Sequence, residues 1–329
     1  MGGHECDRAS KLHLAGTANW TLCERVQLFT HVKPNTNKLK PLTYGWYSHH
    51  GVHMFTETLV RRSRWSPLLD LLAGPHGVDR YIELVNPTWT RGKARARIVA
   101  VRRQTPRSVT LTLAPNRAFT GFKAGQHLNL TVEVDGRRRT RCYSPASADC
   151  DRHLELTIGR HEGGLVSTYL YDHARTGMVV DIDSVGGDFT LPDPLPRRIL
   201  FVSGGSGITP VMSMLRTLRA GRYDGEIAFV HYARSAAEAC YADELADMTG
   251  VRVLHGYTRD QGGDLSGHFD ADHLVTAMPE PDAVFVCGPP ALVDAVRAHG
   301  PDARSESFVP PAFAVPAAAG GGRISFTDS

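Results

Sequence analysis

The residues best suited to bind a ligand lie in a glycine-rich turn in the second half of the chain. Ile199–Val202 is an apolar run typical of a strand buried on both faces, and Gly204, Gly205 and Gly207 separate it from a predicted helix that continues to Leu218. Such a turn joins free backbone N–H groups to the positive end of a helix dipole, which favours a phosphate or pyrophosphate. An ordinary strand-to-helix turn has the same composition, so the motif alone leaves both interpretations open.

The first residues of this helix refine the prediction. Thr209 suits the N-cap and Pro210 suits the first helical position. Pro210 also stands where the third glycine of G-x-G-x-x-G would be, so the turn differs from that dinucleotide fingerprint.

A second group of candidates lies in Arg139–Ser147. Arg141 and Tyr143 alternate on a predicted strand and therefore point the same way. An arginine can hold a phosphate bidentately, a tyrosine can stack on a flat ring, and the Ser144 hydroxyl can reach a ring nitrogen. A basic strand on a solvated face with a buried tyrosine is the alternative.

Gly163–Leu170 is a glycine turn that leads into another predicted helix. Its first-turn amides, with Ser167 and Thr168, suit a second phosphate. An ordinary capped helix is the alternative.

Two further sites follow predicted strands of the second half. Arg234, Ser235 and Tyr241 come after the second strand and Arg259 after the third, where a doubly wound sheet places the ribose of a dinucleotide. Positive charge there suits a 2′-phosphate. The alternatives are a solvated arginine, which is also common, and neutralisation of the charge by Glu238 or Asp260. Cys287 ends the fourth strand; buried cysteines are usually inert, so it means little alone.

The pattern around these residues predicts two domains. Short strands with a period of two, separated by Gly, Pro and Asn, indicate a small antiparallel barrel over 94–194, with a hairpin at Asp135-Gly136. Over 195–309 strands alternate with helices, one of them around Ala236–Met248, which indicates a doubly wound α/β sheet. The proline-rich stretch Leu191–Pro196 marks the boundary.

Together these motifs resemble the ferredoxin–NADP reductase family. The matching segments are R-x-Y-S at Arg141–Ser144, G-G-x-V-S at Gly163–Ser167, G-G-x-G-x-T-P at Gly204–Pro210 and C-G-P at Cys287–Pro289. The resemblance implies an FAD-binding barrel and a nicotinamide-nucleotide domain. It implies flavin contacts from Arg141, Cys142, Tyr143, Ser144, Ser147, Gly164, Val166, Ser167 and Thr168, and nucleotide contacts from Gly205, Gly207, Thr209, Pro210, Cys287, Gly288 and Pro289. Ser144, Cys287 and Glu306 are placed beside the reacting rings.

The C-terminal segment narrows the resemblance. Ser305–Phe308 is similar to the segment that closes this domain in reductases fused to a plant-type ferredoxin, and 310–329 looks like a linker and the start of that domain. The cysteine pattern of a [2Fe–2S] cluster is absent from this sequence. Either the ferredoxin domain is cut short in this sequence, or the electron acceptor is a separate ferredoxin or other iron–sulfur protein. The resemblance is to bacterial reductases that serve fatty-acid desaturases or hydroxylases.

Composition limits the other possibilities. A net charge of +3 argues against a nucleic-acid partner, and the six cysteines have no C-x-x-C pair, which suits reduced thiols. No apolar run is long enough for membrane insertion, so we expect a cytoplasmic protein. His49, His50 and His53 could form a metal site, but they lack the spacing and flanking elements of a known ligand set, so we expect none. We interpret 1–53 as a disordered extension before Met54 and 54–93 as a short helical segment.

The sequence therefore predicts an FAD-dependent reductase that prefers NADPH to NADH. The rival is a flavin-binding remnant that has lost productive electron transfer with its ferredoxin domain.

Overall fold

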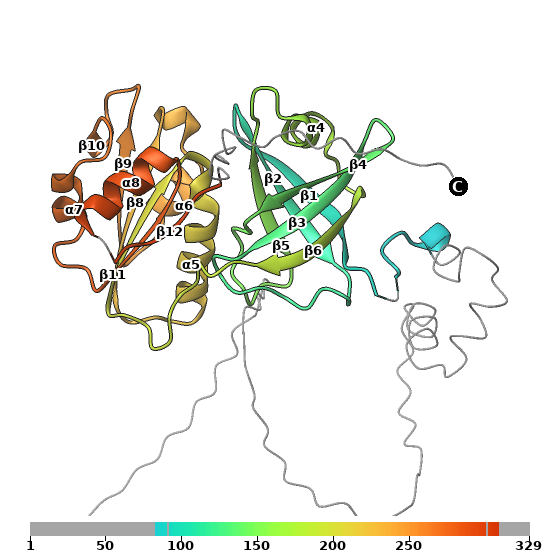
Figure 1. The fold of residues 1–329 in the computed structure, drawn as a ribbon, viewed down its shortest axis with the longest axis horizontal. Helices are drawn as coiled ribbons and strands as arrows, with labels where there is room; N and C mark the ends of the chain where they lie inside the picture. The colour runs from blue at the N-terminus through green and yellow to red at the C-terminus, as the bar shows by residue number, and fades with distance from the viewer. Residues whose placement is uncertain (1–82, 91, 301, 309–329) are drawn as a thin grey trace, which may run out of the picture. The chain divides into compact units, whose positions relative to one another are not determined.

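The computed structural model describes residues 83–90, 92–300 and 302–308. The predictions for 1–53, for most of 54–93 and for 310–329 lie outside these residues. Two sheets account for most of the remainder (Figure 1).

The first sheet is antiparallel and curls around its own apolar core (Figure 1). Its strand order is β4-β3-β6-β1-β2-β5. Leu128 and Leu130 on β3 and Leu111 and Leu113 on β2 are fully buried, as the period of two predicts. The bounds are β1 (Arg95–Thr105), β2 (Ser108–Pro115), β3 (His127–Val134), β4 (Arg137–Tyr143), β5 (Leu154–Gly159) and β6 (Val179–Gly186), with helix α4 (Leu165–His173) between the last two.

The predicted hairpin joins β3 to β4. Asp135 and Gly136 both have positive φ, 50° and 71°, as a two-residue turn matched to strand twist requires. This prediction is confirmed.

Strand β6 was not predicted. It carries Asp181 and Asp183, and aspartate is depleted from strands, so its sequence does not look like one. Asp181 accepts a 2.8 Å hydrogen bond from Arg95 Nε and pairs with Arg138 from β4. The charges that stabilise this strand thus come from its partners in the sheet.

The second sheet is parallel, with strand order β10-β9-β8-β7-β11-β12. Helices α5 and α6 pack on one face around Phe201 and Phe229, and α7 and α8 pack on the other around Val202 and Val230, which confirms the doubly wound prediction. The bounds are β7 (Arg198–Gly204), α5 (Ile208–Ala220), β8 (Glu226–Ala233), α6 (Ala242–Ala246), β9 (Val251–Tyr257), β10 (Leu265–Ser266), α7 (Ala271–Ala277), β11 (Ala283–Cys287), α8 (Pro290–His299) and β12 (Arg304–Glu306).

Two local predictions differ from the structure. The helix expected around Ala236–Met248 is a 3₁₀ turn followed by the short α6, because Tyr241 between them adopts φ 60°, which a helix does not allow. Helix α5 begins at Ile208 with Gly207 as its cap, so Thr209 is not the N-cap and Pro210 is the third helical residue rather than the first. The Thr209 hydroxyl instead donates to the Ser206 carbonyl within the first turn.

Candidate active site

The parallel sheet reverses its direction of growth between β7 and β11. From β7 the chain adds β8, β9 and β10 on one side and then returns to place β11 on the other. The loops that leave the carboxyl ends of β7 and β11 therefore diverge, which creates the crevice where open α/β sheets bind ligands. The two predicted nucleotide motifs, Gly204–Pro210 and Cys287–Pro289, follow these two strands.

Glycines let the two turns approach one another closely. A Cβ on Gly207 would lie 2.3 Å from the Cys287 carbonyl oxygen, and a Cβ on Gly204 would lie 2.7 Å from a methyl of Leu292. At Gly207 backbone therefore packs against backbone, so a side chain there would displace one of the two turns.

A cavity of about 960 Å³ adjoins this crevice and is lined by both domains. Its volume is at the upper end of the range for small-molecule sites. The predicted site residues that it brings together are Arg141, Cys142, Tyr143, Ser144, Gly164, Val166 and Ser167 from the barrel, and Gly205, Thr209, Arg234, Gly288 and Pro289 from the parallel-sheet domain.

On the barrel side, the cavity has an unsatisfied polar group. Ser144 is 3% exposed and its hydroxyl has no hydrogen-bond partner. An unpaired buried hydroxyl costs about 1–3 kcal/mol, so a ligand that bonds to it recovers that energy. Tyr143 lines the cavity beside Ser144, and its burial raises its pKa to about 12 although Arg141 acts in the opposite direction. An aromatic face and a free hydroxyl next to it fit a flat heteroaromatic ring such as a flavin.

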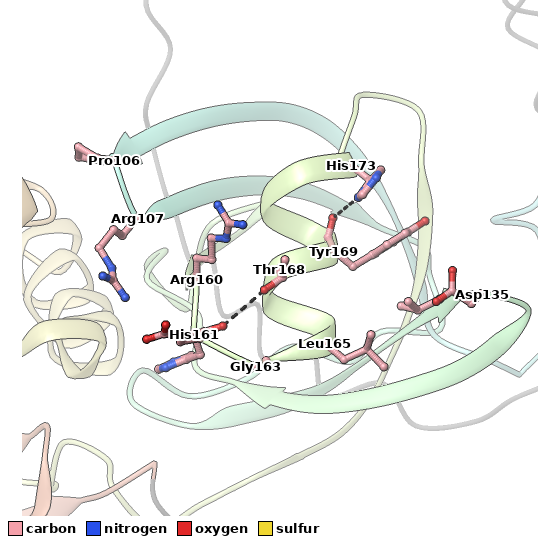
Figure 2. Close-up of a pocket in the computed structure, with 13 residues that line it drawn as sticks. Pro106, Arg107, Asp135, Arg160, His161, Gly163, Leu165, Thr168, Tyr169 and His173 are labelled. Atoms are coloured by element: carbon pink, nitrogen blue, oxygen red, sulfur yellow. Dashed lines mark hydrogen bonds between the residues drawn. The ribbon is translucent and has the colours of Figure 1, made fainter.

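A second hollow, of about 740 Å³, lies at the N-terminus of α4. Figure 2 shows Arg107, Arg160 and His161 on one side of this helix and Asp135 on the other. Thr168 lines this hollow rather than the larger cavity. Both spaces include Arg107, Arg160, His161, Gly164 and Leu165 in their walls, so they adjoin past the start of α4. Arg107 and Arg160 in the shared wall suit an anionic group of a ligand that enters both spaces.

Some predicted residues either do not line the larger cavity or line it without a free polar group. Ser167 reaches it, but its hydroxyl is used within the turn, since it donates to the Gly164 carbonyl and accepts from the His161 amide. The predicted residues outside its wall are Ser147, Thr168, Gly207, Pro210, Ser235, Tyr241, Arg259, Cys287 and Glu306.

Tyr241 does not line the cavity, so it does not occupy the predicted ribose site. It is 2% exposed and its hydroxyl bonds to Thr157 on β5 of the barrel. The Arg216 guanidinium lies over its ring, 5.0 Å from the centroid. Tyr241 therefore belongs to the packing between the two domains and its hydroxyl is not free to meet a phosphate.

The predicted positive charge at the ribose site has a carboxylate beside it. Arg234 lines the cavity and is half-exposed, but Glu238 lines it as well, with 3.8 Å between their charged groups. Arg259 donates its backbone amide to the Arg234 carbonyl. Glu238 is one of the two acidic residues that the sequence suggested could neutralise this charge, and its carboxylate lies four residues after Arg234 in the same cavity wall.

Behind the crevice, Cys287 and Glu306 are neighbours in the parallel pair β11–β12. Burial raises the pKa of the Cys287 thiol well above its ordinary value, and the nearby Glu306 adds to this. Burial also raises the pKa of Glu306, although His127 from β3, 3.2 Å away, acts in the opposite direction. The sequence does not indicate that His127 lies beside Glu306, because His127 begins an ordinary strand pattern and the two residues are 179 positions apart.

Comparisons with known proteins agree with this geometry. Residues 101–191 match the model of an oxidoreductase FAD-binding domain, and residues 201–298 match that of an oxidoreductase NAD-binding domain. An NADPH oxidoreductase of Mycobacterium tuberculosis is 34% identical over 266 residues, which cover 78% of this chain and 66% of the relative. A flavohemoprotein of Halalkalibacterium halodurans is 33% identical over 193 residues, covering 53% of this chain and 47% of the relative.

A solved structure of phthalate dioxygenase reductase, described as modular for electron transfer from pyridine nucleotides to [2Fe–2S], has 25% identity and a TM-score of 0.55. The match covers 65% of this chain and 67% of that one. The chain thus spans about half to two thirds of these proteins. Among the described residues, none of the helices has the length and hydropathy needed to cross a membrane. In the same part of the chain, no three His, Cys, Asp or Glu side chains gather as a metal site would require.

Proposed function

Because the chain belongs to the ferredoxin–NADP reductase family of FAD- and NAD-binding oxidoreductases, we propose that it oxidises NADPH and passes single electrons to an iron–sulfur protein such as a ferredoxin. The observation that carries this proposal is the cavity that joins Tyr143 and the unpaired Ser144 hydroxyl to the glycine turns after β7 and β11. A site that holds two rings face to face must have walls from both domains, and this cavity has them.

The barrel residues would hold the flavin. Bound FAD supplies a ring that accepts a hydride and releases electrons singly. Arg141 can bind the pyrophosphate with a charge-assisted hydrogen bond, since it is exposed at the cavity and, within the described part of the chain, its guanidinium bonds to the Thr140 carbonyl and to no carboxylate. Tyr143 offers its ring face, and the Ser144 hydroxyl gains the partner that it lacks.

The parallel-sheet residues would hold the pyridine nucleotide. Gly205 and Thr209 begin the helix α5 turn, and Gly288 and Pro289 begin the α8 turn, so anionic groups placed between them meet two helix N-termini. Cys287 and Glu306 lie behind these turns, and we assign them to the nicotinamide end. Burial keeps the Cys287 thiol protonated at neutral pH, so it acts as an uncharged packing and hydrogen-bonding group.

The proposal includes a preference for NADPH over NADH, which would come from a small group of residues at the end of β8. Arg234, with Ser235 next in the chain and Arg259 bonded through its amide to the Arg234 carbonyl, would bind the 2′-phosphate, while the Glu238 carboxylate opposes it. We expect kcat/KM for NADPH to exceed that for NADH by roughly tenfold or more, because a charge-assisted hydrogen bond contributes about 1.5–3 kcal/mol. Arg234→Ala/Arg259→Ala should remove the preference, and Glu238→Gln should strengthen it.

The measurement is steady-state kinetics of the full chain with ferricyanide and each nucleotide. Arg252→Ala is the matched control, since Arg252 is an exposed arginine within β9 and lies outside the cavity wall. A preference for NADH, or one that survives the double substitution, would reject this assignment.

The acceptor and the rival function are separated by one series of experiments. The absorbance spectrum of the purified chain should show bound flavin, and anaerobic NADPH should bleach it. A flavin that stays oxidised would favour the rival, a flavin-binding remnant without productive electron transfer. Reduced protein should then be mixed with a plant-type [2Fe–2S] ferredoxin or with a haem protein. Faster reduction of the haem protein than of the ferredoxin would overturn the iron–sulfur assignment. We also propose that the reaction takes place in the cytoplasm.

A further inference from the structure

One face of helix α5 forms hydrogen bonds with residues 146–149, in the loop that follows the Arg141–Ser144 motif. Ser213 Oγ donates to the Ser147 carbonyl at 2.6 Å, Arg216 Nη1 donates to the Ala146 carbonyl at 2.8 Å, and the Asp149 amide donates to Thr217 Oγ1 at 3.1 Å. Ser213, Arg216 and Thr217 have the i, i+3, i+4 spacing of a single helix face. Figure 1 shows α5 on the side of the parallel sheet that faces the barrel.

Arg216 is the centre of these contacts. Its guanidinium forms a bidentate pair with Glu244 on α6, at 2.8 and 2.6 Å, and a 2.8 Å bond to Glu155 on β5 of the barrel. Its side chain is 17% exposed. Glu155 in turn accepts the Ala146 amide at its backbone carbonyl, at 2.7 Å. The loop at Ala146 is thus held from the helix and from the barrel strand by groups that meet at one arginine.

The position of this helix gives these contacts a consequence for the site. The first residues of α5, Ile208 and Thr209, line the cavity. Ser144 lines the cavity from the opposite domain, and the loop 146–149 begins two residues after it. A rigid connection from α5 to Ala146 therefore fixes the Ser144 hydroxyl relative to the nucleotide turn. Displacements of about 1 Å between reacting groups can change a rate by about 10²-fold.

We propose that Arg216 is a positioning residue for hydride transfer, which it controls through the Ala146 carbonyl by setting the flavin-binding loop against the nucleotide-binding helix. This inference rests on the proposed function. Arg216 does not line the cavity, so its effect reaches the site through the loop.

The test compares variants of the full chain with bound FAD. Arg216→Ala removes every contact of the guanidinium, and Arg216→Lys keeps the charge but cannot reproduce the fork geometry. Ser213→Ala/Thr217→Val removes the other two contacts with the loop and leaves all ion pairs intact. Arg219→Ala is the matched control, because Arg219 is an exposed arginine on the same helix.

Two readouts distinguish positioning from stability. Stopped-flow measurement at saturating NADPH gives the reduction rate per bound flavin, which should fall about tenfold or more in Arg216→Ala, less in Arg216→Lys and not at all in Arg219→Ala. Amide hydrogen exchange of the flavin-free protein should speed up at Ala146 and Asp149 in Arg216→Ala and in the Ser213/Thr217 variant.

The outcomes separate the two proposals. If native protein binds no flavin or is not reduced by NADPH, the proposed function fails and takes this inference with it. If native protein is reduced normally and Arg216→Ala keeps the native rate per flavin, only the positioning role is overturned. Should Arg216→Ala not fold, Arg216→Lys decides, because it keeps the charge and loses the fork geometry that reaches Ala146; a native reduction rate per flavin in Arg216→Lys then overturns the proposal.

Discussion

Gly207→Ala tests the close contact at the switch point of the parallel sheet. An added Cβ would lie 2.3 Å from the Cys287 carbonyl oxygen, 2.5 Å from its carbon and 2.6 Å from the Gly288 nitrogen. All three are backbone atoms, so no side chain can rotate away. The substitution must separate the turn after β7 from the turn after β11.

The size of the effect follows from two opposing contributions. Gly207 has φ −66° and ψ −4°, which alanine adopts without strain, so the change would otherwise stabilise the protein by about 0.4–1 kcal/mol through the unfolded state. Overpacking against a rigid neighbour costs about 1–3 kcal/mol, and contacts this short belong at the upper end. We expect a net loss of about 2 kcal/mol in the free energy of unfolding.

Urea unfolding and NADP⁺ titration of the same preparations measure the two consequences. Gly207→Ala should unfold at lower urea and bind NADP⁺ about tenfold more weakly or worse, since the amides of both turns move from their shared ligand. Gly221→Ala is the control at the other end of α5: its φ is −75° and its nearest contact would be an ordinary 3.4 Å. A Gly207→Ala protein as stable as native, with native affinity for NADP⁺, would refute the reasoning.

Two further predictions concern buried polar side chains. Ser144→Ala should keep its FAD but be reduced by NADPH at least about tenfold more slowly if its free hydroxyl meets the reacting ring, and an unchanged rate would remove Ser144 from the site. His231 is fully buried with its Nδ1 2.8 Å from Ser203 Oγ, and burial, with a contribution from nearby His255, lowers its pKa to about 3. Between this value and about 6.5 the unfolded chain binds the extra proton, so stability should fall as pH falls through that range, by up to about 1.4 kcal/mol per pH unit. His231→Gln should flatten this slope in urea unfolding at several pH values, whereas His299→Gln, at an exposed position, should not; equal slopes in His231→Gln and native protein would contradict the prediction.

Local patterns account for what the sequence predicted of the fold. The Asp135-Gly136 hairpin follows from two residues that tolerate positive φ. The strand–turn–helix at Gly204–Leu218 follows from an apolar run, three glycines and a helical period. In each case the information lies within about twenty neighbouring residues.

The missed features depend on contacts that are distant in the sequence. Strand β6 was hidden by Asp181 and Asp183, and the partners that make Asp181 acceptable, Arg95 and Arg138, lie 86 and 43 residues away. Similarly, the contact between His127 and Glu306 joins residues that are 179 positions apart. Such placements are tertiary and leave no periodic signal.

Tyr241 shows how the same limitation bears on function. Its position after β8 suggested the ribose of a dinucleotide, because chain order in a doubly wound sheet indicates which edge a loop reaches. Chain order does not indicate where a side chain points, and here a φ of 60° turns Tyr241 inward to Thr157, 84 residues away on the barrel. The loop therefore divides its roles: Arg234 and Glu238 line the cavity, while Tyr241 lies under Arg216 in the contact that joins the two domains. Tyr241→Phe should consequently leave the kcat/KM ratio of NADPH to NADH unchanged, because the Tyr241 hydroxyl bonds to Thr157 and not to a nucleotide phosphate.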